Sequence, residues 1–175
     1  WPDSIGAWKV YATYDLDKDG KKEFLVLSDP ASSASDTSMP SIYRFEATGN
    51  NTYALVWSAK LPGTNSGRFS YPDLTVADMD GDGNQEIFVA VLSSGRDGST
   101  DINPPRVQIY EYDPMIGNFP SEPTMSTNLG MRDGFRYRPT RIIVDNVDSD
   151  PDKEMVITSR GDDFGGSNSG RTLTV

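Results

Sequence analysis

The sequence predicts an all-β chain, and three observations carry that prediction. Segments of alternating or β-branched residues are separated by dense Gly and Pro, and no stretch follows the 3.6-residue helical period. One Asp-rich pattern occurs three times, with leading aspartates at 15, 78 and 145, so the intervals are 63 and then 67 residues. Each copy lies between two strand-like runs. A repeat of this length fits a four-stranded unit better than a pair of helices.

Each repeat is expected to supply up to four strands. Those of the first unit are expected at 8–14, 24–27, 41–46 and 53–57. Those of the second unit are expected at 87–92, at 106–111 and, obscured by two prolines, within 119–127. Those of the third unit are expected at 140–144, 155–158 and 171–175.

Four short strands per unit, stacked radially, are typical of β-propeller blades. The chain is therefore predicted to be a single propeller segment, 1–175, of about two and a half to three blades. The blades are expected at roughly 5–62, 68–130 and 135–175, with the last incomplete. Because propellers close with about 4–8 blades, the ring is expected to be completed by blades outside these residues or, alternatively, by other chains.

Composition excludes several kinds of function. The 175 residues include 26 acidic and 16 basic side chains, for a net charge of −10, and neither His nor Cys. There is thus no disulfide framework, thiol nucleophile, zinc finger or catalytic histidine. The negative charge argues against nucleic acid as a partner. The longest apolar run, 87–92, is far shorter than the ~20 residues of a membrane span.

The repeated loops have the pattern Asp-x-Asp-x-Asp-Gly-x-x-Glu, which suits a hard divalent cation. Carboxylates at alternate positions repel one another unless a cation lies between them. Ca²⁺ takes 6–8 oxygen ligands in irregular geometry, whereas Mg²⁺ demands a tight octahedron and fits less well. The seventh position is expected to contribute its backbone carbonyl. The candidate ligands are Asp15, Asp17, Asp19, Lys21 and Glu23 in the first loop, and Asp78, Asp80, Asp82, Asn84 and Glu86 in the second.

The third loop departs from the pattern, and its first ligand is left open. Aligned on Glu154, the ligands are Asn146, Asp148, Asp150 and Glu154. Aligned on the preceding strand, Asp145 takes the first place and one residue is inserted. In this loop Pro151 replaces the glycine, and Asp152 would offer the backbone carbonyl.

An EF-hand interpretation is disfavoured. That motif needs a Glu at position twelve and flanking helices. Position twelve is Val26 in the first loop and Val89 in the second, both within strand-like runs. The loops are instead predicted to be strand–loop–strand calcium sites that hold up to three Ca²⁺ ions.

The segment 76–89, Val-Ala-Asp-Met-Asp-Gly-Asp-Gly-Asn-Gln-Glu-Ile-Phe-Val, resembles an FG-GAP/VCBS-type repeat, as in integrin α-chain propellers and many secreted bacterial proteins. The resemblance extends to all three units. It implies a calcium-binding β-propeller, often seven-bladed, that acts in adhesion, in extracellular assembly or beside a secreted enzyme. Glu stands at the ninth position where integrin loops usually have Asp, and no Phe-Gly/Gly-Ala-Pro signature is evident, so the likeness is nearer the VCBS branch.

The function expected from this resemblance is that of a non-catalytic, calcium-binding scaffold or adhesion module of a secreted, cell-surface or periplasmic protein. Its expected partners are the remainder of its own propeller or neighbouring subunits, together with an extracellular protein or glycan. Two alternatives are a propeller domain of an extracellular lyase or hydrolase, and a structural subunit of a large surface assembly. Ionisable side chains clustered on the central channel, with perturbed pKa values, would favour the enzyme.

A basic cluster precedes the third unit. Its members are Arg132, Arg136, Arg138 and Arg141. The main interpretation is a solvated strand face that pairs with acidic loops. The sharper alternative is a binding site for an acidic glycan.

Overall fold

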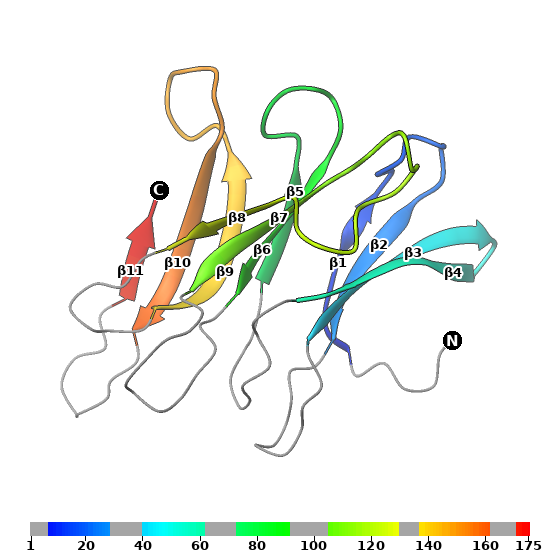
Figure 1. Ribbon diagram of the computed structural model, residues 1–175, viewed down its shortest axis with the longest axis horizontal. Helices are drawn as coiled ribbons and strands as arrows, with labels where there is room; N and C mark the ends of the chain where they lie inside the picture. Colours follow the sequence, from blue (N-terminus) through cyan, green and yellow to red (C-terminus); the bar gives the residue numbers. More distant parts are fainter. Residues whose placement is uncertain (1–6, 29–39, 62–72, 92–104, 130–136, 162–170) are drawn as a thin grey trace, which may run out of the picture.

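The computed structural model describes residues 7–28, 40–61, 73–91, 105–129, 137–161 and 171–175. In these residues every regular element is a β-strand, so the all-β prediction is confirmed. The strands form three antiparallel sheets, each following chain order: β1-β2-β3-β4, β5-β6-β7-β8 and β9-β10-β11. Figure 1 shows the sheets side by side, with the loops after β1, β5 and β9 projecting from one common edge.

Most of the strands overlap the segments predicted to be strands. The first sheet contains β1 (Ala7–Tyr14), β2 (Glu23–Ser28), β3 (Ser41–Gly49) and β4 (Thr52–Lys60). The second contains β5 (Asp73–Ala77), β6 (Glu86–Val91), β7 (Arg106–Glu111) and β8 (Met125–Asn128). The third contains β9 (Tyr137–Asp145), β10 (Glu154–Gly161) and β11 (Arg171–Thr174).

The fourth strand of the second sheet is shorter and lies later than the expected segment, 119–127. Strand β8 pairs with β7 from Ile109↔Met125 to Arg106↔Asn128. Pro120 and Pro123 have no N–H to give to a ladder, which delays the strand. The chain before them forms a turn closed by a bridge between Asp113 and Asn118.

The centre of the middle sheet, at β6, is buried on both of its faces, whereas its edge strand β8 is exposed. All six residues of β6 are buried, which explains its continuous apolar run. One face meets the first sheet in a cluster that includes Leu25, Leu27, Ile87 and Val89. The other face meets the third sheet in a second cluster. That second cluster is formed by Ala77, Phe88, Ala90, Val107, Ile142 and Ile157.

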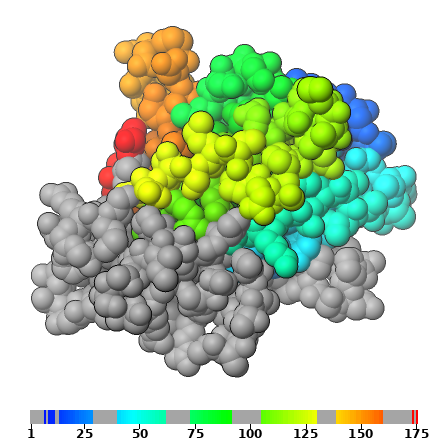
Figure 2. Space-filling model, in the orientation of Figure 1, coloured from blue at the N-terminus to red at the C-terminus, as the bar shows by residue number. Residues whose placement is uncertain are grey.

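Aromatic side chains close the seam between the first two sheets. The ring of Trp57 lies 5.6 Å from that of Tyr110 and 5.4 Å from that of Phe119, centroid to centroid. The indole N–H of Trp57 also donates to the backbone oxygen of Pro120 at 3.2 Å. Figure 2 shows the yellow-green β7–β8 connection lying against the cyan strands of the first sheet. The turn that displaces β8 therefore fixes one sheet on the next.

No helix among the described residues is long and apolar enough to cross a membrane.

Candidate metal centres

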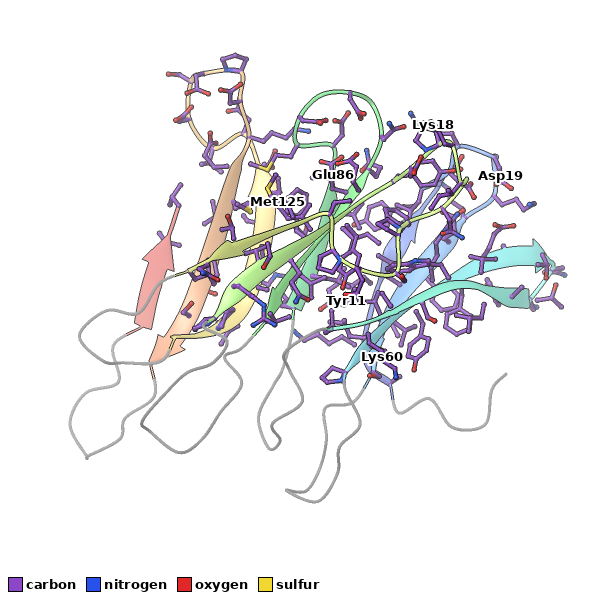
Figure 3. The ribbon with its side chains drawn as sticks, in the orientation of Figure 1. Tyr11, Lys18, Asp19, Lys60, Glu86 and Met125 are labelled. Atoms are coloured by element: carbon purple, nitrogen blue, oxygen red, sulfur yellow. The ribbon has the colours of Figure 1, made fainter. Side chains whose placement is uncertain are left out.

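The three predicted loops each gather carboxylates into a group able to hold a metal ion. Within each group, one ligand oxygen per residue lies within 4.8 Å of all the others. Figure 3 shows these side chains at the edge where the first two strands of each sheet are joined, with Asp19 and Glu86 labelled. The groups are Asp15, Asp17, Asp19 and Glu23; Asp78, Asp80, Asp82 and Glu86; and Asp148, Asp150 and Glu154.

The closing glutamate plays the same structural part in each loop. One of its carboxylate oxygens accepts the N–H of the residue seven positions earlier, which fixes the width of the loop. These bonds are Leu16 N to Glu23 at 2.7 Å, Met79 N to Glu86 at 2.6 Å and Val147 N to Glu154 at 2.9 Å. Because the three bonds are equivalent, the loops can share one numbering from position one to position nine. Position one is Asp15 in the first loop, Asp78 in the second and Asn146 in the third.

The aspartates at positions three and five each accept the N–H two residues further on, as in Asx turns. Position three accepts from position five, and position five accepts from position seven. The distances are 3.3 and 2.8 Å in the first loop, 3.1 and 2.6 Å in the second, and 2.9 and 2.9 Å in the third. These bonds orient two carboxylates in each loop, and the ligand oxygens of these aspartates lie close to that of the closing glutamate. Residues Lys21, Asn84 and Asp152 supply the N–H groups at position seven.

Position one depends on the glycine at position six. The N–H of Gly20 donates to Asp15 at 3.1 Å, and the N–H of Gly83 donates to Asp78 at 3.0 Å. Both glycines have positive φ, +87° and +90°, a region that L side chains rarely adopt. The glycine therefore aims an N–H inward at the first carboxylate.

The third loop has different residues at positions one and six, and its turn is held by a different hydrogen bond. Pro151 at position six has no N–H, so an aspartate at position one would lack its donor. Asn146 occupies that place, and its side-chain amide donates to the backbone oxygen of Asp150. The hydrogen bonds follow the alignment on Glu154, whereas Asp145 ends β9 opposite Glu154 and accepts the N–H of Asn146 at 2.9 Å. The carboxylate of Asp145 lies outside the grouped oxygens.

The second loop holds buried negative charge without compensation among the described residues. Glu86 is 3% exposed, and its Oε1 and the Oδ1 of Asp78 have no hydrogen-bond partner there. Glu111 faces Glu86 across the β6–β7 ladder. Burial raises the pKa of Glu86 to about 7, and the charges of Glu111, Asp80 and Asp78 add to the shift. A cation between these oxygens would offset the unfavourable free energy of burying their negative charge.

A cationic side chain from β3, Arg44, already contacts the carboxylates of the first loop. Arg44 is 1% exposed, and its Nη2 lies 2.5 Å from Asp17 Oδ2 and 3.3 Å from Glu23 Oε1. Its Nη1 donates to Asn118 at 3.2 Å. Burial nevertheless raises the pKa of Glu23, although the hydrogen bond from the Leu16 N–H and the charge of Arg44 both act to lower it. Sequence reasoning missed Arg44, because only strand register brings it to the loop.

Two lysines connect neighbouring loops. Lys18 Nζ in the first loop lies 3.5 Å from Asn84 Oδ1 in the second. Lys153 Nζ in the third loop donates to the backbone oxygen of Asp78 at 2.5 Å. The middle loop is therefore linked to both of its neighbours, at the position-one carbonyl and at the position-seven side chain.

A second ionisable cluster lies away from the loops, on the first strands of the three sheets. The side chain of Asp73 on β5 is fully buried and accepts from Lys9 Nζ and Tyr11 Oη of β1, both at 2.7 Å. It also accepts the N–H of Ile142 on β9 at 3.0 Å, and Arg141 Nε lies 3.9 Å away. One carboxylate thus joins all three sheets. No local pattern in the sequence marks Asp73.

Arg141 is the one member of the predicted basic cluster whose side chain the structure describes. It points to Asp73 of the neighbouring sheet, rather than to an acidic loop. Arg132 and Arg136 lie outside the described residues, as does the side chain of Arg138.

Comparison with known families agrees with the repeated loops. Residues 15–89 match the family model of the FG-GAP-like repeat, a span that covers the first two loops and the strands between them. No curated protein matches the chain. Repeats of this family are generally non-catalytic modules, typical of extracellular proteins with propeller-like folds. Residues 15–89 are therefore similar to the FG-GAP-like repeat.

Proposed function

We propose that this chain is a calcium-binding β-propeller segment of a secreted or cell-surface protein, and that it acts as a rigid scaffold or interaction module. The observation that carries the proposal is the recurrence of one hydrogen-bond scheme in three loops. In each loop the scheme turns several carboxylates toward a common point. The buried oxygens of Asp78 and Glu86 that find no hydrogen-bond partner in the described part of the chain are a second, independent support.

The donor chemistry favours Ca²⁺. The ligands available are carboxylate and carbonyl oxygens on an irregular loop, which Ca²⁺ accepts at about 2.3–2.6 Å with variable coordination. Mg²⁺ would need a near-ideal octahedron and would keep several waters. In each loop the ion would be held by positions one, three, five and nine, with the backbone carbonyl of Lys21, Asn84 or Asp152 completing the shell.

Calcium would act mainly on stability. Each ion would neutralise a carboxylate group and join the first two strands of one sheet, since positions one and nine adjoin those strands. A ligand that binds only the folded state adds its binding free energy to stability. Because Lys18 and Lys153 link the loops, this effect would extend from one sheet to the next.

The propeller arrangement is supported by the stacking of the sheets and by Asp73. Its bonds join β1, β5 and β9, the strands that would line a central channel. Apolar side chains on the two outermost sheets stay exposed, including Tyr53 and Leu55 on β4 and Leu173 on β11. Further blades, or neighbouring subunits, would cover these faces.

The enzyme alternative receives little support from the inner strands. Burial and the contact with Asp73 raise the pKa of Tyr11, so its hydroxyl stays protonated at neutral pH. Asp73 is fully buried and already holds Lys9, Tyr11 and the Ile142 N–H. Neither group is poised to remove a proton from a substrate. The cluster suits a structural or binding role better than a catalytic one.

Calorimetric titration of the calcium-stripped chain with CaCl₂ tests the proposal. We expect saturable binding of up to three ions, with much weaker binding of Mg²⁺. Replacing two carboxylates of one loop, Asp80→Asn with Asp82→Asn, should remove one site and leave the others. The matched control is Asp113→Asn, which alters an acidic turn outside the loops. Absence of calcium binding by the folded wild-type chain would overturn the proposal.

A further inference from the structure

A cavity of about 350 Å³ opens where the first strands of the three sheets meet. Its polar wall consists of Lys9, Tyr11 and Tyr14 from β1, Thr75 from β5 and Arg141 from β9. Leu74 and Ile142 form part of the apolar wall. Tyr11 is labelled at this place in Figure 3, between the first and second sheets and away from the acidic loops. The site is separate from the candidate metal centres.

The charge presented to this cavity is positive, although the protein as a whole carries −10. Two cations, Lys9 and Arg141, surround the single carboxylate of Asp73. That carboxylate is fully buried, whereas the side chain of Arg141 is 67% exposed and that of Lys9 is 33% exposed. The N–H groups not used on Asp73 are therefore the ones that an incoming ligand meets.

The cavity wall is held in place before any ligand arrives. The hydroxyl of Tyr11 donates to Asp73 at 2.7 Å and accepts the N–H of Leu74 at 3.2 Å, which fixes its ring. Lys9 is anchored on the same carboxylate oxygen. A preorganised wall loses little conformational entropy on binding. Two further polar residues, Tyr14 and Thr75, line the same space.

The size and the lining together define the ligand class. Small-molecule pockets typically measure about 300–1,000 Å³, so the space suits an organic molecule far better than an inorganic ion. Arginine presents a planar fork that matches a carboxylate. Aromatic rings and hydroxyls accept the alternating C–H and O–H surfaces of a sugar ring. A sugar that carries a carboxylate, such as a hexuronate, meets all three requirements.

We propose that this inner-strand cavity binds a carboxylate-bearing sugar. Its carboxylate would lie on Arg141 and Lys9, and its ring would lie against Tyr11 and Tyr14, with Thr75 in reach of a hydroxyl. The ligand is a uronate, free or as a residue of an acidic polysaccharide. No residue of the acidic loops belongs to this site, so the sugar-binding proposal does not depend on the calcium proposal.

NMR titration of the full chain in CaCl₂ tests the site. D-galacturonate and D-glucuronate are added separately, with galactose as the sugar lacking a carboxylate and acetate as the carboxylate lacking a ring. We expect at least one uronate to bind with Kd of about 1 mM or tighter, and about tenfold more tightly than either control. The backbone amides of Leu74, Thr75 and Ile142 should shift, while those of Ala54 and Leu55 should not. An oligogalacturonate that binds more tightly than the monomer would identify a polysaccharide as the source, and equal affinity would identify the single sugar.

The variant Arg141→Gln should weaken uronate binding about tenfold, because it removes the exposed half of the carboxylate clamp. Its side chain is largely exposed, so the fold should be retained, which circular dichroism can verify. The matched control Lys60→Gln removes an exposed cation from β4 and should leave binding unchanged. The proposal is overturned if neither uronate shifts the inner-strand amides, if galactose or acetate binds as well as the uronates, or if Arg141→Gln binds them as tightly as the wild type.

Discussion

Nη2 of Arg44 lies 2.5 Å from Oδ2 of Asp17, so a buried cation pairs with carboxylates of the first acidic loop, whereas no described residue forms such an ion pair with the carboxylates of the second. In the β2–β3 register Arg44 stands opposite Leu25, and the corresponding residue of the β6–β7 ladder is Ile109, opposite Phe88. The same calcium-loop pattern thus occurs in two electrostatic settings. Without metal, Arg44 offsets part of the negative charge of the first loop, and no described residue forms an ion pair with the carboxylates of the second loop.

Replacing Arg44 by Met should destabilise the metal-free protein more than the calcium-bound protein. Asp17 and Glu23 would lose their cation, and breaking a buried ion pair by removing one partner costs about 3–5 kcal/mol. Because calcium would supply the missing charge, the loss should be much smaller in CaCl₂. Urea unfolding with and without calcium measures both values. Equal losses in the two conditions would show that no ion occupies the first loop.

Glu86→Gln should have the opposite effect on the metal-free protein. It removes a buried charge that no described cation offsets, so the melting temperature without calcium should stay the same or rise. The gain in melting temperature on adding calcium should shrink, because one ligand of the second loop is weakened. Glu122→Gln, at an exposed position, is the matched control and should leave both values unchanged. A calcium response identical to that of the wild type would contradict the assignment of Glu86 as a ligand.

The third loop should be improved by restoring the pattern of the first two. Asn146→Asp combined with Pro151→Gly returns both the first carboxylate and the N–H that supports it. We expect calcium affinity at this site to rise about tenfold or more, since an anionic ligand replaces a neutral one. Asn146→Asp alone should gain less, because its carboxylate lacks the donor from position six. Calorimetry on the three proteins checks this order, and a gain from the single variant equal to that from the double would refute the coupling.

The stability of the metal-free protein should depend on pH in a direction unusual for a carboxylate-rich chain. The pKa of Glu86 is raised from its ordinary value of 4.5 to about 7, so between these values the folded state binds more protons than the unfolded state. Its contribution to the free energy of unfolding therefore increases as pH falls from about 7 toward 4.5. With calcium bound the trend should reverse, because protons then compete with the ion. Chelex-treated buffers with and without CaCl₂ would reveal the two slopes, and parallel slopes would contradict the prediction.

Asp73→Asn should weaken the junction of the three sheets. The substitution leaves Lys9 without its buried partner and weakens the bond from the Ile142 N–H, a change of the kind that costs about 3–5 kcal/mol. Tyr11→Phe removes only one hydroxyl and should cost about 1–2 kcal/mol. Urea unfolding in CaCl₂ compares the two variants. If Asp73→Asn were the milder of the two, the carboxylate would not be the centre of the junction.

The sequence predicts the strands and the loops well, because their signals are local. Alternation marks β1 and β3, and the nine-residue Asp pattern marks the turns between paired strands. Arg44 and Asp73 escape prediction because their roles depend on register and on contacts between sheets. Arg44 reaches Asp17 across 27 positions, and Asp73 reaches Lys9 across 64. The late start of β8 was predictable only in part. Pro120 and Pro123 indicate an interrupted strand, but they do not determine the residue at which pairing with β7 resumes.

The most direct test of the calcium account is the melting temperature of the full chain in EGTA, in CaCl₂ and in MgCl₂ at equal ionic strength. We expect a lower melting temperature in EGTA, restored by Ca²⁺ and restored less by Mg²⁺. An unchanged melting temperature in all three solutions would contradict it.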